Sequence, residues 1–319
     1  MIPGRRGRLT VAALGLLFLA SLALGVGELR LGAIGRDPNA DLLFFVSRLP
    51  RTLAVALTGA SMAVAGLVMQ VIVRNRFVEP TTAGTGESAA LGLLAVSLLA
   101  PGASLAAQMG AATLTALAGT AVFLAVVRRL PPQQPLLVPL VGLIYGGIIG
   151  AVTTFVGYET DLLQYIAVWT NGEFSGVLRG RYELLWVGGG LAALCYFFAD
   201  RLTIASLGRE ASVGLGLDYR AMEALGLGVV AMTTAVVVAT VGMIPFIGLV
   251  VPNLVSRAMG DNLRKSLPYV AAAGAGLTLA CDMIGRALRY PYEVPVGTVL
   301  GVVGAALFLW LLLGGRRRA

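Results

Sequence analysis

Histidine is absent from this chain of 319 residues, and with it the commonest metal ligand and proton relay of proteins. Cysteine is rare, because Cys195 and Cys281 stand alone inside apolar stretches and form neither a metal-ligand spacing nor a disulfide framework. Charged residues make up 13% of the chain, against about 25% in soluble domains, whereas apolar residues reach 57%. This composition argues against a soluble enzyme, a nucleic-acid-binding module and a disordered protein. It predicts an all-α polytopic membrane protein.

Catalytic motifs are missing as well. The chain has no Gly-x-x-x-x-Gly-Lys-Ser/Thr phosphate loop, so any ATP must be hydrolysed on a separate chain. It also lacks His-Glu-x-x-His, Gly-x-Ser-x-Gly and any cluster of carboxylates. We therefore expect no catalytic residue, no metal site and no cofactor bound by this chain.

What the chain contains instead is a series of apolar runs, and a membrane-spanning helix needs about 20 such residues. Polar breaks divide them into ten candidate spans: 9–27, 53–73, 86–100, 106–127, 136–157, 183–199, 221–241, 246–257, 267–285 and 295–313. The third and eighth are short and flanked by glycine and proline. They predict broken helices at membrane depth, where protein or a cavity must satisfy the freed backbone groups.

Basic residues indicate the orientation. With the N-terminus inside, the inner segments hold 16 of the 24 Arg and Lys residues, and the outer segments hold eight, matched by eight acids. Ten spans then place both basic termini on the cytoplasmic side. The same arrangement makes 28–52 an external loop and 158–182 an external region whose aromatic residues suit an interfacial helix.

The segment 200–220 lies on the inner side and is longer than a connection needs. Ser206 is placed to cap a short helix that the later glycines end. Such a helix is too short to span the membrane, so it is either a docking element for another protein or an ordinary interfacial linker. The pattern alone leaves these two interpretations equal.

Two acids fall inside the apolar runs, where burial of a charge costs several kcal/mol by most scales. Asp282 stands four residues before Arg286 on one helix face, which favours a structural ion pair over a functional role. Glu87 follows a Thr- and Gly-rich turn, and it either charges a helix N-terminus or serves the transport path. A proton-coupled carrier would want more acids or a histidine, so it is the weaker alternative.

Three ordered blocks carry a resemblance to a known family. They are Arg48-Leu49-Pro50-Arg51-Thr52-Leu53 with Gly59-Ala60 and Gly66 to Gln70, then Leu207-Gly208-x-Glu210-Ala211 with Leu215-Gly216-Leu217-Asp218, and finally Gly248-Leu249-Val250-Val251-Pro252-Asn253, Asp282-x-x-x-Arg286 and Glu293-Val294-Pro295-Val296-Gly297. Together they resemble the FecCD-type, BtuC-like permeases of bacterial ABC importers. These proteins are membrane subunits that import iron–siderophore complexes, haem and cobalamin.

The resemblance implies one transmembrane permease domain over residues 1–319, with ten helices in the type II ABC importer fold, in the bacterial inner membrane. It implies a cytoplasmic ATPase dimer that binds the ATP and Mg, a periplasmic or lipid-anchored siderophore-binding protein, and a second permease subunit. The implied ATPase-coupling residues are Leu207, Gly208, Arg209, Glu210, Ala211, Gly214, Leu215 and Gly216. Those implied to dock the binding protein are Arg48, Arg51 and Arg286.

Departures from the commoner family pattern narrow the resemblance. Asn253 stands where many members have His, and Asn75-Arg76 where they have Asn-Pro. These positions are similar to a subgroup that handles catecholate and mixed siderophores of the petrobactin and anguibactin kind and usually pairs with a different permease chain. A heterodimer is therefore favoured over a homodimer. Glu173 also departs from the pattern, without an explanation from the sequence.

The expected cargo is an intact ferric siderophore, because a chain without His or a Cys pair is poorly equipped to strip and bind bare Fe(III). The same machinery carrying haem or a corrinoid is the alternative within the family. A proton-driven carrier that relies on Asp282 and Glu87 is the alternative outside it.

Overall fold

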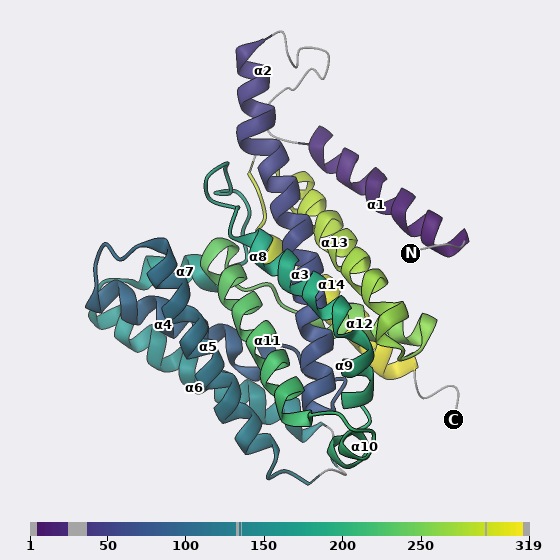
Figure 1. Cartoon of the computed structure of the whole chain (residues 1–319). Helices are drawn as coiled ribbons and strands as arrows, with labels where there is room; N and C mark the ends of the chain where they lie inside the picture. Colours follow the sequence, from purple (N-terminus) through teal and green to yellow (C-terminus); the bar gives the residue numbers. More distant parts are fainter. Residues whose placement is uncertain (1–4, 25–36, 132–133, 135, 291, 315–319) are drawn as a thin grey trace.

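A computed structural model describes residues 5–24, 37–131, 134, 136–290 and 292–314 (Figure 1). Every regular element in these ranges is helical. The helices are α1 (Arg5–Ala23), α2 (Pro38–Leu42), the π-helical turn η2 (Leu43–Arg48), α3 (Leu49–Val73), the 3₁₀ turn η3 (Thr81–Ala83), α4 (Thr85–Leu99), α5 (Leu105–Val127), α6 (Leu137–Glu159), α7 (Leu163–Thr170), α8 (Leu185–Phe197), α9 (Ala199–Ala205), α10 (Arg209–Gly214), α11 (Tyr219–Val241), α12 (Ile247–Met259), α13 (Leu263–Leu288) and α14 (Val296–Gly314).

Each of the ten apolar runs falls on a helix. By length and composition, six helical segments of the described residues are able to cross a membrane: Pro38–Val73, Leu105–Val127, Leu137–Glu159, Tyr219–Val241, Leu263–Leu288 and Val296–Leu313. The pair α8 and α9, bent by 71°, makes a seventh if it is one span. Three shorter apolar helices remain, Gly7–Ala23, α4 and α12. The prediction that the third and eighth runs form short helices is thus confirmed.

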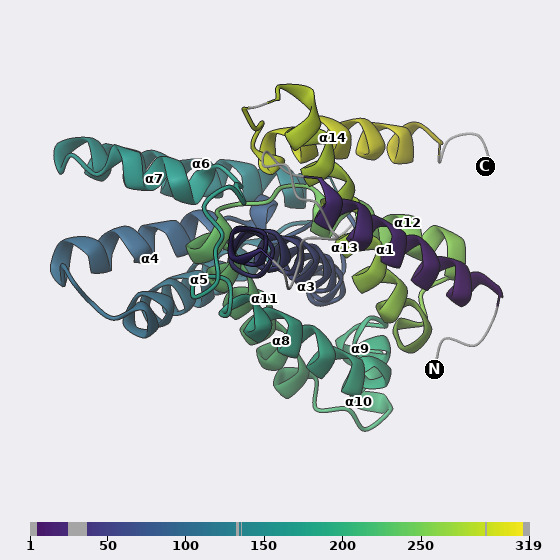
Figure 2. The same ribbon diagram turned by 90° about the horizontal axis from the view of Figure 1, so that it is seen from above.

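Helix α3 is the central element of the bundle. Seen from above, it stands end-on among α1, α8, α11 and α13 (Figure 2). It packs closely because it is rich in small residues: a Cβ on Gly59 would lie 2.4 Å from the Gly274 carbonyl oxygen of α13, and one on Gly66 would lie 2.2 Å from the Gly248 Cα of α12. Small residues at helix contacts are the means by which membrane helices approach closely.

The external segment predicted as a loop over 28–52 is helical from Pro38 onward. The Asp37 carboxylate accepts a hydrogen bond from the Asn39 amide at 3.0 Å, and Pro38 occupies the first helical position. Both features favour a helix start, and α2, η2 and α3 then continue as one helical stretch. The first part of the predicted loop, 28–36, lies outside the described residues.

The two other predicted non-spanning segments also contain short helices. Within 158–182 the structure has α7, in agreement with the predicted interfacial helix. Within 200–220 it has most of α9 and all of α10, so this segment is more than a linker in extended conformation. The sharp bend between α8 and α9 lies at Phe198, inside the predicted sixth span.

Candidate functional sites at the two ends of the bundle

The predicted functional residues gather at two opposite ends of the bundle, which α3 connects (Figure 1). We call them the α2 end, where α3 begins and α13 finishes, and the α10 end, where α3 finishes. Arg48, Arg51 and Arg286 lie at the α2 end. The coupling residues 207–216 lie at the α10 end, where a Cβ on Gly208 would come within 2.8 Å of Cζ of Arg74, the residue that caps α3.

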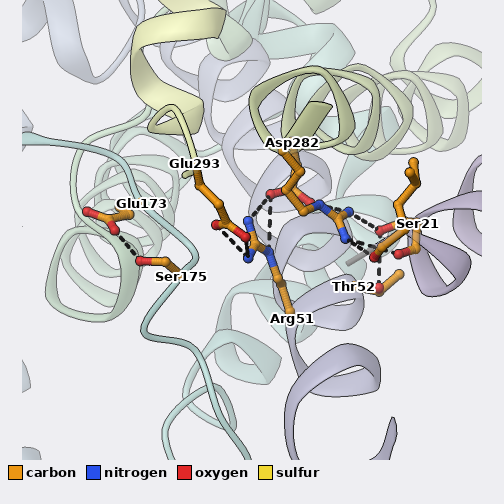
Figure 3. Close-up of polar contacts among 9 residues, drawn as sticks. Ser21, Arg51, Thr52, Glu173, Ser175, Asp282 and Glu293 are labelled. Carbon is orange, nitrogen blue, oxygen red and sulfur yellow. Dashed lines mark hydrogen bonds and ion pairs between the residues drawn. The ribbon is translucent and has the colours of Figure 1, made fainter. Parts of the chain in front are cut away.

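At the α2 end, ion pairs join four charged side chains into one chain of contacts (Figure 3). Arg51 of α3 places Nη2 2.8 Å from Asp282 Oδ1 of α13, and its Nη1 lies 2.8 Å from Glu293 Oε2. Arg286 Nη2 lies 2.6 Å from Asp282 Oδ2. The expected ion pair between Asp282 and Arg286 is therefore present. Arg51 and Glu293 are additional members, so two cations and two anions balance in the network.

The arginines of this end also hold the last turn of α1. Arg286 donates to the carbonyl oxygens of Ser21 and Leu24 at 3.1 and 2.7 Å, and Arg48 donates to those of Leu22 and Ala23 at 3.1 and 2.9 Å. The last carbonyls of a helix lack intrahelical partners as a rule, and cationic side chains are favoured at a helix C-terminus.

These arginines are buried, whereas the charges of a docking surface are expected to be exposed. Arg48 and Arg286 are only 6% and 7% exposed, and the Arg51 side chain 13%. The physical reason is that α1 and α13 lie over the guanidinium groups and supply their acceptors. A partner reaches these groups only where the network opens, so their docking role stays a prediction.

Glu173, which the sequence left unexplained, lies near this network (Figure 3). Its carboxylate accepts a hydrogen bond from the Ser175 hydroxyl, and its amide donates to the Val241 carbonyl at 2.8 Å. The preceding Gly172 accepts a hydrogen bond from the Gly297 amide at 2.8 Å. This turn therefore connects the end of α11 with the start of α14.

At the α10 end, the predicted coupling segment protrudes from the bundle. Among residues 207–216 only Gly208 and Ser212 are buried, whereas Leu207, Val213 and Leu215 are each more than half exposed. Ser212 holds the segment in place, because its hydroxyl lies 2.9 Å from the Ile204 carbonyl oxygen and 2.7 Å from that of Gly208. The sequence had not singled out Ser212.

Asn253, a candidate for either a structural role or a place on the transport path, makes structural contacts, and a role in the path stays a prediction. Its Nδ2 donates to the Arg76 carbonyl at 2.8 Å and to the Leu249 carbonyl at 2.6 Å. The side chain thereby fastens the turn after α3 to α12. It lies at the α10 end, on the wall of a cavity of about 400 Å³ that Leu207 also lines.

Glu79 is the functional candidate that the sequence reasoning missed. Its buried carboxylate accepts hydrogen bonds from the Phe246 and Leu249 amides at 2.8 and 3.0 Å, and from the Thr81 hydroxyl at 2.7 Å. It thus caps the N-terminus of the short helix α12 from the connection between α3 and α4. The available signal was an acid before a proline next to a predicted broken helix.

Glu87 and Glu79 line one cavity of about 400 Å³. Its wall includes Leu143 of α6, Gly172 and Thr298 of α14. Glu87 Oε2 is buried without a hydrogen-bond partner. In the described part of the chain no three His, Cys, Asp or Glu residues converge as a metal site would require.

Known proteins resemble this chain over nearly its whole length. Residues 12–314 match the FecCD transport family. The petrobactin import system permease protein YclN of Bacillus subtilis is 42% identical over 95% of this chain and 96% of its own length. The ferric-anguibactin transport system permease protein FatD of Vibrio anguillarum is 40% identical over 88% and 90%.

Two solved structures have a similar fold over most of the chain. A metal-chelate type ABC transporter in an inward-facing conformation is similar with a TM-score of 0.79 and 26% identity, over 96% of this chain and 99% of that one. PsaBC from Streptococcus pneumoniae shares the fold, with a TM-score of 0.63 and 13% identity over 88% and 93%. From the family match and the full-length relatives, the chain belongs to the FecCD transport family.

Proposed function

We propose that this chain is the permease subunit of an ATP-driven importer that carries an intact ferric siderophore of the catecholate or mixed type into the cytoplasm. The observation that carries the proposal is the full-length likeness to permeases of petrobactin and ferric anguibactin. The vitamin B12 import permease BtuC of Serratia proteamaculans is 36% identical over 86% of this chain, which keeps a corrinoid as the second candidate cargo.

The proposed chain crosses the bacterial cytoplasmic membrane ten times with both termini inside. The six long helices, the bent pair and the three short apolar helices supply ten crossings. The excess of arginine in the segments at the α10 end favours the cytoplasmic side for that end. Short α4 and α12 cross with the help of protein caps such as Glu79, since lipid offers their backbone no partner.

Coupling to ATP hydrolysis is proposed to run through α10. In this proposal a separate cytoplasmic ATPase dimer binds ATP and Mg. The exposed apolar side chains of Leu207, Val213 and Leu215 provide an apolar surface to which the ATPase binds. Exposed apolar residues on a helix outside the membrane-spanning segments are typical of protein contacts. Nucleotide binding would shift α10 and bias the bundle between outward and inward access.

Delivery of the cargo is proposed to occur at the α2 end. A periplasmic or lipid-anchored binding protein would present carboxylates that replace Asp282 or Glu293 as partners of Arg51 and Arg286. Exchange of ion-pair partners keeps every guanidinium group neutralised while α1, α3 and α13 move. A second permease subunit would complete the transport path, and we favour a subunit of different sequence over a second copy of this chain.

Uptake of a doubly labelled ferric siderophore tests the function. Cells expressing the importer should accumulate the iron label and the ligand label in equal amounts, and loss of the ATPase should abolish accumulation of both. Haem and cobalamin should not compete. Uptake that ignores loss of the ATPase but collapses with a proton uncoupler would contradict the proposal and favour the proton-driven carrier.

Substitution in α10 tests the coupling. Glu210→Gln should lower uptake per ATP hydrolysed about fivefold or more, the lower range of typical coupling free energies. Asp200→Asn is the matched control, because Asp200 is also exposed but lies outside α10 and pairs with Arg264 of α13. An equal effect of the two substitutions would contradict a specific role of α10.

A further inference from the structure

A cavity of about 970 Å³ lies at the α10 end, beside the coupling segment, with which it shares Arg209. Its lining residues come from the ends of α3 and α5, the starts of α6 and α11, and α10. Its polar wall consists of Arg74, Arg128, Arg209, Arg220, Tyr219 and Glu223, together with Asn75 and Gln134. We call it the arginine pocket.

Positive charge in the arginine pocket is incompletely neutralised. Glu223 pairs with Arg128 and is the one acid of the described lining. Among the described residues, Arg74, Arg209 and Arg220 have no carboxylate within 4 Å. Arg74, Arg128, Arg209 and Arg220 all line this one cavity, so four guanidinium groups share its wall. Like charges that converge repel each other unless an anion lies between them.

The position of the pocket corresponds to the level of lipid phosphates. Arg74 and Arg128 follow the last residues of α3 and α5, and Arg220 is the second residue of α11. Helices that cross a bilayer end at the headgroup region, and basic pockets between them on the cytoplasmic side hold anionic headgroups. Guanidinium groups suit phosphate because they donate two parallel hydrogen bonds to it.

The apolar part of the same wall favours a lipid over a soluble anion. Leu124, Val127, Leu130 and Val138 line the pocket. Their helices continue outward with the exposed side chains Val122, Val126 and Leu140. A headgroup in the pocket would therefore leave its acyl chains against an apolar surface of α5 and α6.

We propose that the arginine pocket binds a phosphate group, supplied by the headgroup of an anionic phospholipid of the inner leaflet. The phosphate would lie between Arg74, Arg209 and Arg220, with the Tyr219 hydroxyl as a further donor. Such a lipid would join the coupling helix α10 to α3 and α11 through one shared anion. The proposal does not depend on which cargo is transported.

Thermal unfolding of the purified full-length chain in lipid nanodiscs tests the proposal. Phosphatidylglycerol added to phosphatidylcholine should raise the unfolding midpoint of the wild-type chain. The increase should be lost in Arg74→Gln/Arg220→Gln and kept in Arg129→Gln, which removes an exposed arginine beside the pocket rather than in it. The double variant Arg74→Lys/Arg220→Lys should keep part of the increase, since it retains the charges without the two parallel hydrogen bonds that a guanidinium group donates.

Phosphatidylcholine nanodiscs without anionic lipid show whether the variants fold, because their midpoints there should match the wild type. Inorganic phosphate added to these nanodiscs is the second arm. If phosphate alone reproduces the increase and the Gln/Gln variant abolishes it, the site is a phosphate site whose source is soluble, and the lipid assignment is overturned. If the Gln/Gln variant responds to phosphatidylglycerol as the wild type does, the whole proposal is overturned.

Discussion

Asp282 shows how a single buried charge holds three helices together. Its carboxylate has no solvent exposure and lies between Arg51 of α3 and Arg286 of α13, while Arg286 also donates to the end of α1. Charges in an apolar interior are tolerated only when paired and hydrogen-bonded. The network is electrically balanced, so loss of one anion leaves an excess positive charge inside the bundle.

Asp282→Asn should destabilise the chain strongly. Removal of one partner from a buried pair costs about 3–5 kcal/mol, because the other charge stays buried without compensation. Thermal unfolding in a neutral detergent would measure the loss. Asp261→Asn is the control, since Asp261 forms an ion pair with Arg76 in which both side chains are more than 60% exposed, and such pairs contribute about 1 kcal/mol or less. Similar losses for the two variants would refute the structural role of Asp282.

Glu79 is a second buried acid whose role depends on the hydrogen bonds that its carboxylate oxygens accept. Glu79→Gln replaces one carboxylate oxygen by an amide nitrogen, which cannot accept a hydrogen bond from the Phe246 or Leu249 amide. A buried donor left unpartnered costs about 1–3 kcal/mol. We expect a lower unfolding midpoint and faster hydrogen exchange at residues 246–249. Glu159→Gln, an exposed acid at the end of α6, should change neither, and unaltered exchange in Glu79→Gln would show that the cap contributes nothing.

At the scale of elements, α12 is a short helix whose formation depends on contacts with its neighbours. It has 13 residues and contains Pro252, and it begins after Phe246, whose φ of +66° lies in the left-handed region. Its first turn depends on Glu79 and on close contact with α3, where Gln70 Nε2 donates to the Gly248 carbonyl at 3.1 Å. Its position is therefore set by neighbours rather than by its own propensity.

Gly66→Ala tests this contact between α3 and α12. A methyl group at position 66 would meet the Gly248 Cα and carbonyl oxygen at 2.2 Å, and backbone atoms have little freedom to move away. Overpacking of this kind costs about 1–3 kcal/mol. Gly228→Ala in α11 meets nothing within 4 Å, so it should be neutral or gain about 0.5–1 kcal/mol from helix propensity. Equal unfolding midpoints for the two variants would show that the helices do not approach as described.

At the scale of the whole molecule, α6 and α14 leave most of their residues at least partly exposed. In the membrane-spanning windows of α6 and α14 only 22% of residues are buried, against 78% for the stretch that contains α3. The cavity that Glu79 and Glu87 line lies between α6 and the start of α14. A second permease subunit that packs on these two helices would close this cavity into a path between the subunits.

Cysteine cross-linking tests that arrangement. Ile148→Cys on α6, treated with a thiol-to-amine bifunctional reagent, should be joined to the second permease chain in native membranes, seen as a species of about doubled mass. Leu114→Cys on α5 is the control, because its side chain is similarly exposed but lies on the helix away from the cavity. The native Cys195 and Cys281 are buried and should not react. Cross-linking at residue 114 but not at 148 would place the second subunit on the other face.

Local patterns in the sequence were enough to assign the class of the protein and much of its local structure. Apolar runs of limited length predicted the helices, including the short α4 and α12, because hydrophobicity and glycine–proline breaks are local properties of the chain. The pairing of Asp282 with Arg286 was predictable for the same reason, since four residues make one helical turn. The three family blocks identified the transport family that the full-length relatives confirm.

Contacts between residues far apart in the chain could be read from the three-dimensional structure alone. Arg51 pairs with Asp282 across 231 positions, and Glu79 caps α12 from 167 positions away. Arg48 is buried rather than exposed because the end of α1 lies over it. Each of these outcomes depends on where helix ends converge, and that position follows from side-chain packing over the entire bundle, which no local pattern in the chain encodes.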